Sequence, residues 1–228
     1  EIAGKILEID VDSLAYMQNP PVVSRFEELP PSIQSMLSIQ AIGGRNYSGL
    51  VFQKYINQYI KFVSNVGQDL VESVFSYTYC VPMAVTHVVE AYLENRQLKL
   101  DGMINFGWRG WEGDLPTALI MNCPSNSSLT EQVIAYYDEA IATSPSRLRP
   151  LTCYYHIDPR PNKFQGTAIT GVQAYMGTEI PSLTGSVVFT DFGTRVSQGP
   201  TRGVLAYTKF KKECMQRDYG ILETDYDF

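Results

Sequence analysis

Short segments of alternating apolar and polar residues recur through most of this chain and constrain its fold more than any other feature. Each spans about four to eight residues and is bounded by Gly, Pro or Asn, which is typical of β-strands joined by turns. The predicted strands are Gly4–Val11, Leu50–Gln53, Tyr59–Val63, Val71–Tyr79, Thr152–Ile157, Ala168–Tyr175, Gly185–Asp191 and Gly203–Tyr207. Such regularly spaced short strands predict an all-β fold, either a sandwich, a barrel or a propeller.

Two longer stretches depart from this period and predict helices. Pro82–Leu98 carries apolar residues at helical spacing, and its proline suits a helix first turn. Leu129–Ala142 also has a helical pattern, with Thr130 as a candidate cap. A shorter helical turn is expected within Ser32–Ile39.

The composition narrows the class of protein. The chain has 228 residues, of which 44% are hydrophobic, 18% are charged and 15 are Tyr, a globular composition that favours strands. The net charge is −6 and no basic run is present, so nucleic-acid binding is not expected. No apolar run reaches the roughly 18 residues of a membrane-spanning helix. The chain begins at Glu1 without a visible signal peptide, which suggests a processed chain or an excised fragment.

The cysteines give only weak information about the compartment. None forms a Cys-x-x-Cys pair, which disfavours zinc-ribbon and thioredoxin-type sites, and both buried thiols and disulfides stay open for Cys80, Cys123, Cys153 and Cys214. Two Asn-x-Ser triplets, the acceptors of N-linked glycans, begin at Asn46 and Asn126. These triplets lead us to expect a secreted or extracellular glycoprotein.

Both tryptophans of the chain lie in the segment Ile104–Gly113, together with three glycines. Glycine allows tight turns and close approach of a ligand to the backbone, and tryptophan offers a large rigid face. The segment therefore predicts a strand end and a loop that present a surface.

Several landmarks follow one another in a fixed order. They are Gly4–Asp10, Gly44–Asn46, Asn65–Asp69, Asn105–Trp108 with Trp111–Gly113, Ile169–Gly171, Ala174–Gly177 and Val188–Gly193. Together they resemble the glucose/sorbosone dehydrogenase family, the soluble quinoprotein sugar dehydrogenases. The resemblance covers most of the chain, from Gly4 to Gly193.

The resemblance implies a portion of a six-bladed β-propeller. Residues 1–228 would form a single partial propeller domain, with residues 82–98 and 129–142 as helical insertions. The matching segments begin well inside the family's fold, and half a propeller would expose sheet edges and a blade face. We therefore expect a tightly held partner, either the amino-terminal part of the same propeller or another chain.

The family binds pyrroloquinoline quinone (PQQ) and calcium, and the resemblance assigns residues to both. Arg45 and Asn46 match the pair that contacts the quinone, and the backbone carbonyls of Gly67 and Gln68 match the calcium loop. The alternatives are a salt-bridged Arg45, a turn-forming or glycosylated Asn46, and a simple tight turn at Gly67.

Other residues bear on the same site. Trp108 and Trp111 are candidates for stacking on the cofactor or on a sugar ring, or for packing between blades. Asp69 and Glu72 stand close enough in sequence to add negative charge. Met176 departs from the family, which has Arg or Lys there to meet a cofactor carboxylate.

The catalytic residues stay unknown at this stage. The family's base is a histidine in the part that precedes this chain, and His87 and His156 are better interpreted as structural. The first hypothesis is a quinoprotein dehydrogenase that oxidises an aldose or related sugar. The alternative is a non-catalytic secreted propeller that acts as a binding, scaffold or assembly protein. No Gly-x-Ser-x-Gly elbow is present, so an α/β hydrolase is disfavoured.

Overall fold

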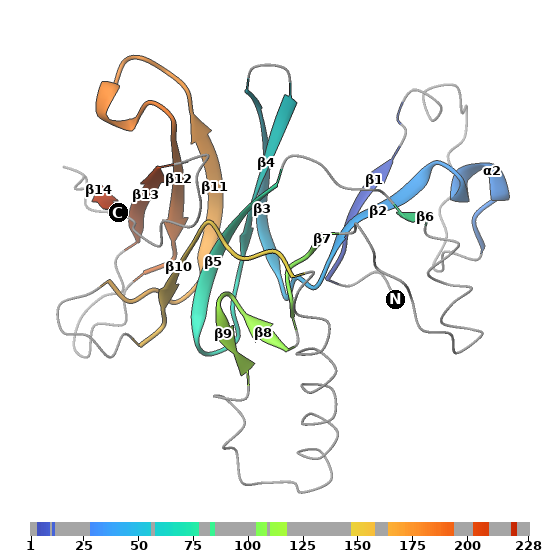
Figure 1. Ribbon diagram of the computed structural model, residues 1–228, viewed down its shortest axis with the longest axis horizontal. Helices are drawn as coiled ribbons and strands as arrows, with labels where there is room; N and C mark the ends of the chain where they lie inside the picture. Colours follow the sequence, from blue (N-terminus) through green and yellow to red (C-terminus); the bar gives the residue numbers. More distant parts are fainter. Residues whose placement is uncertain are drawn as a thin grey trace, which may run out of the picture. The chain divides into compact units, whose positions relative to one another are not determined.

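A computed structural model describes residues 4–9, 11, 28–55, 58–77, 83–84, 104–108, 110–117, 147–157, 164–193, 203–209 and 220–222. This part of the chain consists mostly of antiparallel β-strands, so the predicted all-β class is confirmed (Figure 1). The chain divides into two compact units. The first contains Glu1–Ile42 and Cys80–Asn105, and the second contains Gly43–Tyr79 and Phe106–Phe228. The six-bladed propeller and the single partial domain stay predictions.

The first unit contains one small sheet. Its strand β2 (Leu37–Ile42) pairs with three others, namely β1 (Ile6–Ile9), β6 (Met83–Ala84) and β7 (Ile104–Asn105). The pairing is antiparallel with β1 and β6 and parallel with β7.

One expectation about helices is confirmed in this unit and one needs correction. The short helical turn expected within Ser32–Ile39 is present as α2 (Pro31–Gln34), and it ends before the chain enters β2 at Leu37. The helix expected from Pro82 does not begin there, since Met83 and Ala84 pair with β2 instead. Pairing with a neighbouring strand has overridden the local helical pattern.

The second unit contains two four-stranded antiparallel sheets; the strands of one are consecutive along the chain, whereas the other has β6 to β9 between its third and fourth strands. The first consists of β3 (Tyr47–Tyr55), β4 (Gln58–Asn65), β5 (Val71–Tyr77) and β10 (Thr152–Tyr155). The second consists of β11 (Ile169–Tyr175), β12 (Ser186–Asp191), β13 (Val204–Lys209) and β14 (Gly220–Leu222), with the 3-10 turn η4 (Pro181–Leu183) between β11 and β12. A short hairpin is formed by β8 (Trp111–Glu112) and β9 (Leu115–Pro116).

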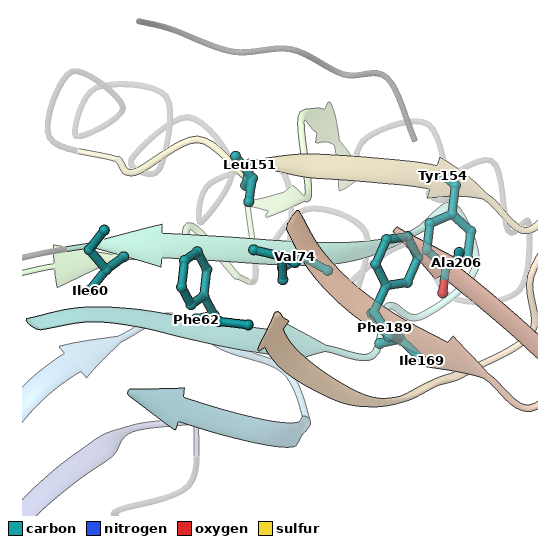
Figure 2. Packing of buried hydrophobic residues seen from close by; sticks show 10 residues of the cluster. Ile60, Phe62, Val74, Leu151, Tyr154, Ile169, Phe189 and Ala206 are labelled. Carbon is teal, nitrogen blue, oxygen red and sulfur yellow. The ribbon is translucent and has the colours of Figure 1, made fainter. Parts of the chain in front are cut away.

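The two larger sheets pack against each other around one apolar core (Figure 2). Strands β3 and β4 lie against β11, and the core contains Phe62 and Val74 from one sheet with Phe189 from the other. A Cβ on Gly49 of β3 would lie 3.1 Å from the backbone nitrogen of Val172 on β11. Glycine at this position therefore lets the two backbones approach closely.

Phe106 fixes the tryptophan-containing segment to the first large sheet. Its side chain is only 1% exposed, and its ring centroid lies 4.5 Å from that of Phe75. Tyr47 meets it edge-on at 5.9 Å, and Tyr77 lies at 6.0 Å. This aromatic cluster places the loop after Phe106 beside the ends of β3, β4 and β5.

Several predicted features lie outside the described residues. These are residues 85–98, 129–142, His87, Asn126, Cys80, Cys123 and Cys214. Cys153 lies half-buried in strand β10.

The packing of Phe189 provides a test of this core. Phe189 is 1% exposed in the core, whereas Phe192 is 67% exposed just beyond the same strand. Phe189→Ala is expected to lower the free energy of unfolding by about 3–5 kcal/mol, because it removes a buried ring and leaves a cavity. Phe192→Ala is expected to change it by no more than about 0.5 kcal/mol. Urea unfolding measures both, and equal effects would contradict the described packing.

Candidate functional site

The loop that carries Arg45 is anchored at the end of strand β4. The backbone N–H groups of Arg45 and Asn46 both donate to Oδ1 of Asn65, at 2.9 and 3.1 Å. In return, the N–H of Val66 donates to the carbonyl of Asn46 at 2.8 Å. Asn65 is only 5% exposed, so a buried side-chain amide fixes the direction in which Arg45 leaves the sheet.

The side chain of Arg45 lies on the next loop along the sheet. Its Nε donates to Oε1 of Gln68 at 2.7 Å, and its Nη1 donates to the carbonyl of Gly67 at 2.6 Å. The guanidinium carbon also lies 5.8 Å from the ring centroid of Trp108, within cation–π range. We call Arg45, Gly67, Gln68 and Trp108 the Arg45 cluster; Arg45 and Trp108 are half-buried and Gln68 is exposed.

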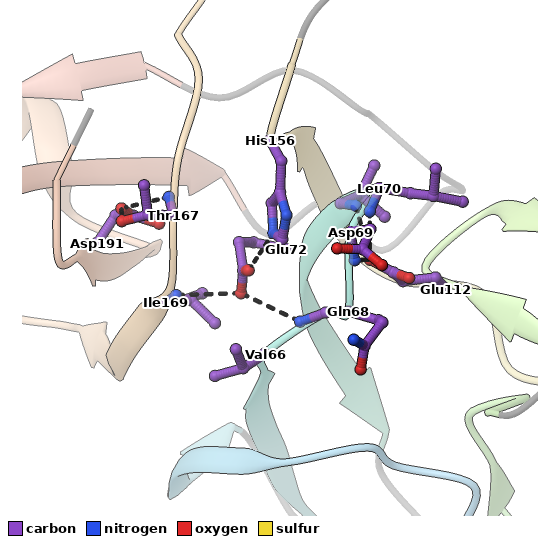
Figure 3. Close-up of polar contacts among 12 residues, drawn as sticks. Val66, Gln68, Asp69, Leu70, Glu72, Glu112, His156, Thr167, Ile169 and Asp191 are labelled. Carbon is purple, nitrogen blue, oxygen red and sulfur yellow. Dashed lines mark hydrogen bonds and ion pairs between the residues drawn. The ribbon is translucent and has the colours of Figure 1, made fainter. Parts of the chain in front are cut away.

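A buried carboxylate shapes the loop that carries Gly67 and Gln68. Oε1 of Glu112 accepts the successive backbone N–H groups of Asp69, Leu70 and Val71 at 3.0, 2.7 and 3.0 Å (Figure 3). Glu112 is only 1% exposed. Because three successive N–H groups converge on one carboxylate oxygen, the loop is held in one tight turn.

The close fit of this loop explains the glycine at position 67. A Cβ there would lie 2.0 Å from the carbonyl oxygen of Val71 and 2.4 Å from Oε1 of Glu112. No side chain fits in that space unless the loop moves. The carbonyl of Gly67 is therefore held where Arg45 can reach it.

Glu72 holds the other side of the same loop. Its carboxylate is fully buried on β5, and its Oε2 accepts the N–H groups of Gly67 at 3.3 Å and Ile169 at 3.0 Å. Its Oε1 contacts Nε2 of His156 in an ion pair (Figure 3). Glu72 thus joins the Gly67 loop, the start of β11 and the residue after β10.

Opposing effects set the protonation of His156. Burial by itself would lower the pKa of His156, but the hydrogen bond and charge of Glu72, together with the charges of Glu112 and Asp191, raise it above its usual value. These effects favour the protonated, positively charged form of His156 beside the buried carboxylate of Glu72.

Asp191 closes the polar network at the end of β12. Its Oδ2 accepts the hydroxyl of Tyr154 at 2.7 Å, and its Oδ1 accepts the N–H groups of Thr167 at 3.0 Å and Gly193 at 2.9 Å. It is 3% exposed. Three buried carboxylates, Glu72, Glu112 and Asp191, thus each bind backbone N–H groups of the turns around the cluster.

Trp111 has a different environment from Trp108. The guanidinium of Arg147 lies 4.1 Å from the ring centroid of Trp111, and its Nη1 donates to the carbonyl of Gly113 at 2.8 Å. Arg147 also forms an ion pair with Asp114 at 3.7 Å, with both side chains almost fully buried. Trp111 therefore packs within the protein on this side, whereas Trp108 belongs to the Arg45 cluster.

The structure brings together most of the residues that the sequence singled out. Asn46 is exposed beside Arg45, but its described hydrogen bonds involve its backbone only. Met176 is 42% exposed at the end of β11. Glu112 had no role predicted from sequence, although an acid between a tryptophan and a glycine was a usable signal, and Glu72 was expected only to add charge.

The implied cofactor can be compared with the donors present. Arg45 fits a quinone oxygen, because its Nη2 makes no hydrogen bond to the described residues. The Gly67 carbonyl does not fit as a calcium ligand in this arrangement, because it already accepts Nη1 of Arg45 and a second cation beside the guanidinium would be repelled. Among the described residues, no group of three or more His, Cys, Asp or Glu side chains is placed to hold a metal ion.

Comparison with known proteins assigns neither a family nor a function to this chain. No protein-family model matches this chain, and no curated protein matches it with significant similarity. None of the helices in the described ranges combines the length and apolar character that crossing a membrane requires.

The role of Glu112 leads to a stability prediction. Glu112→Ala is expected to lower the free energy of unfolding by about 3 kcal/mol or more, because it leaves three N–H groups of one turn without their charged acceptor. Glu179→Ala, at an exposed position of the same unit, is expected to change it by no more than about 0.5 kcal/mol. Thermal and urea unfolding measure both variants. Equal stability of the two would show that the Glu112 contacts do not hold the loop.

Proposed function

We propose that this chain is the carboxy-terminal part of a quinoprotein-type β-propeller that oxidises an aldose or related sugar, with the Arg45 cluster on its ligand-binding face. The observation that carries the proposal is the contact of Arg45 with Gly67 and Gln68. The resemblance to glucose/sorbosone dehydrogenases assigns these segments, about 20 residues apart in sequence, to one cofactor site. Their convergence is what such a site requires.

The arrangement of the strands supports the same proposal. A propeller blade is a four-stranded antiparallel sheet whose strands follow one another along the chain. The β11–β12–β13–β14 sheet has this topology, and the β3–β4–β5–β10 sheet has the same antiparallel neighbour order with β6 to β9 inserted before its last strand; the two sheets pack against each other. Two successive blades would bring loops from neighbouring strands to one end.

Arg45 and Trp108 would make different contacts with a ligand at this face. Arg45 would donate hydrogen bonds to a ligand oxygen through Nη2, and the ring of Trp108 would cover a flat or ring-shaped ligand. The chemistry that PQQ supplies when bound is acceptance of a hydride from the sugar. The catalytic base would come from the preceding part of the propeller, since His156 is engaged by Glu72.

A second candidate function is a non-catalytic secreted propeller that binds a sugar or serves as a scaffold. It is favoured by one contact, the hydrogen bond from Arg45 to the Gly67 carbonyl, which uses the position assigned to calcium. The exposed thioether of Met176, which carries no charge for a cofactor carboxylate, favours it too. In this case the Arg45 cluster would bind its ligand without oxidising it.

An activity assay separates the two candidates. With PQQ and calcium added, the full protein is expected to reduce a redox dye in the presence of aldoses. Arg45→Ala is expected to lower kcat/KM by about 100-fold or more, because it removes a charged donor to the reacting region. Arg149→Ala, at an exposed arginine of the same unit, is expected to leave it unchanged. Sugar binding without dye reduction would replace the first candidate by the second.

The proposed propeller also needs a partner, and one sheet face fits it. Leu50, Phe52 and Tyr59 of the β3–β4 hairpin are 42%, 55% and 57% exposed on the face opposite the one that packs on β11. Lys54 and Lys61 share this face, with Lys61 over the ring of Phe52. Grouped exposed apolar side chains with a charged surround mark an interaction site. Because the other face of this sheet is covered by a four-stranded sheet, we propose that a preceding blade of the same protein covers this one.

Association in solution tests the partner. This chain alone is expected to self-associate or aggregate in size-exclusion chromatography with light scattering, and to become monomeric when the preceding part of the protein is supplied. Replacing Leu50 and Phe52 by Lys is expected to weaken binding of that part, whereas Thr170→Lys, exposed on β11, is not. A soluble, well-folded monomer of the chain alone would contradict the need for a partner.

A further inference from the structure

A continuous series of polar contacts leads from His156 to Arg45. Nε2 of His156 contacts Oε1 of Glu72, and Oε2 of Glu72 accepts the N–H of Gly67 at 3.3 Å (Figure 3). The carbonyl of the same Gly67 accepts Nη1 of Arg45 at 2.6 Å. One residue, Gly67, is thus held by Glu72 through its nitrogen and by Arg45 through its oxygen.

We propose that His156 and Glu72 are positioning residues for Arg45, so that ligand binding at the Arg45 cluster depends on whether His156 carries its proton. Neither residue belongs to the cluster, and each acts through the backbone of Gly67. The inference rests on the proposed function, because that function makes the Arg45 cluster the ligand site.

The buried charges explain why the proton matters. The acidic groups that act on His156 come from three elements: Glu72 on β5, Glu112 on β8 and Asp191 on β12. Glu112 accepts three backbone N–H groups, and Asp191 accepts two together with the hydroxyl of Tyr154. Glu72 also accepts two, one of them long, but it alone has its remaining oxygen in the contact with His156. A buried carboxylate that loses its positive partner is strongly destabilised. Glu72 is therefore the group that responds when His156 loses its charge.

The direction of the pH dependence follows from these contacts. Although burial opposes it, the contact with Glu72 raises the pKa of His156 above its usual value of about 6.5. The stabilisation is fully present below that usual value and is lost as the pH rises through the raised pKa. Deprotonation on the alkaline side should thus loosen the Gly67 loop and release Arg45, and acidification to about pH 6 should not.

The fluorescence of Trp108 reports the state of the cluster without any ligand. Trp108 and Trp111 are the only tryptophans of the chain, so a Trp111→Phe background isolates the Trp108 signal. In this background an alkaline transition is expected. His156→Gln, whose amide can still donate to Glu72 but does not titrate, should abolish the transition. His87→Gln, at the only other histidine, should retain it.

A second variant keeps the proposal testable if His156→Gln does not fold. His156→Lys preserves the positive charge and is expected to move the transition upward, toward the ordinary lysine pKa of about 10.4. An alkaline transition that is absent from the background protein, or unchanged in folded His156→Gln or His156→Lys, would overturn the proposal.

The same variants connect the transition to binding. With glucose as the probe and the full protein, affinity is expected to fall about tenfold through the transition, equivalent to one unit of coupled pKa, and to stay flat in His156→Gln. A fluorescence transition that responds to His156 without any glucose binding would contradict the proposed function alone. Glucose binding that shows no dependence on His156 would overturn the positioning role alone.

Discussion

The carboxylate of Glu72 is fully buried, and its contacts join three segments at one end of the two large sheets. It binds the N–H of Gly67 in the loop after β4, the N–H of Ile169 at the start of β11, and His156 after β10. Burying a charge is costly unless it is paired and hydrogen-bonded, so these contacts must form together. Glu72 therefore links the second large sheet to the Gly67 loop, whose shape it sets together with Glu112.

The candidate site is a consequence of that arrangement. Glu112 accepts the N–H groups of the residues after Gln68 and holds them in a turn. Glu72 accepts the N–H of Gly67, and the carbonyl of the same Gly67 accepts a hydrogen bond from Arg45. Arg45 is therefore held by rigid elements of the sheet and not by a long free loop. A guanidinium held in this way loses less conformational entropy when it binds a ligand oxygen. Glu72 and Glu112 thus fix the position of Arg45 on the surface where we propose that the ligand binds.

The sequence predicted strands well where alternation was clear, as in Tyr59–Val63, which lies within β4. It was wrong at Met83, because helical spacing cannot anticipate that a strand of the same unit offers a partner. Trp108 and Trp111 look alike in sequence, yet each lies beside a different arginine from a distant segment, Arg45 at 5.8 Å and Arg147 at 4.1 Å. The His156–Glu72 pair, separated by 84 residues, is likewise a product of the tertiary fold. Local sequence patterns identified Arg45, Gly67 and Trp108 as candidate site residues. They did not identify the buried acids that hold the Gly67 loop in place.

The central claim is that the Arg45 cluster is a ligand-binding surface of a larger propeller. A crystal structure of the full protein with a bound aldose tests it most directly. The account predicts that the sugar lies against Trp108 and within hydrogen-bonding distance of the Arg45 guanidinium. It also predicts a further sheet on the face that carries Phe52. A sugar bound elsewhere, with Arg45 facing only its own loop, would contradict the account.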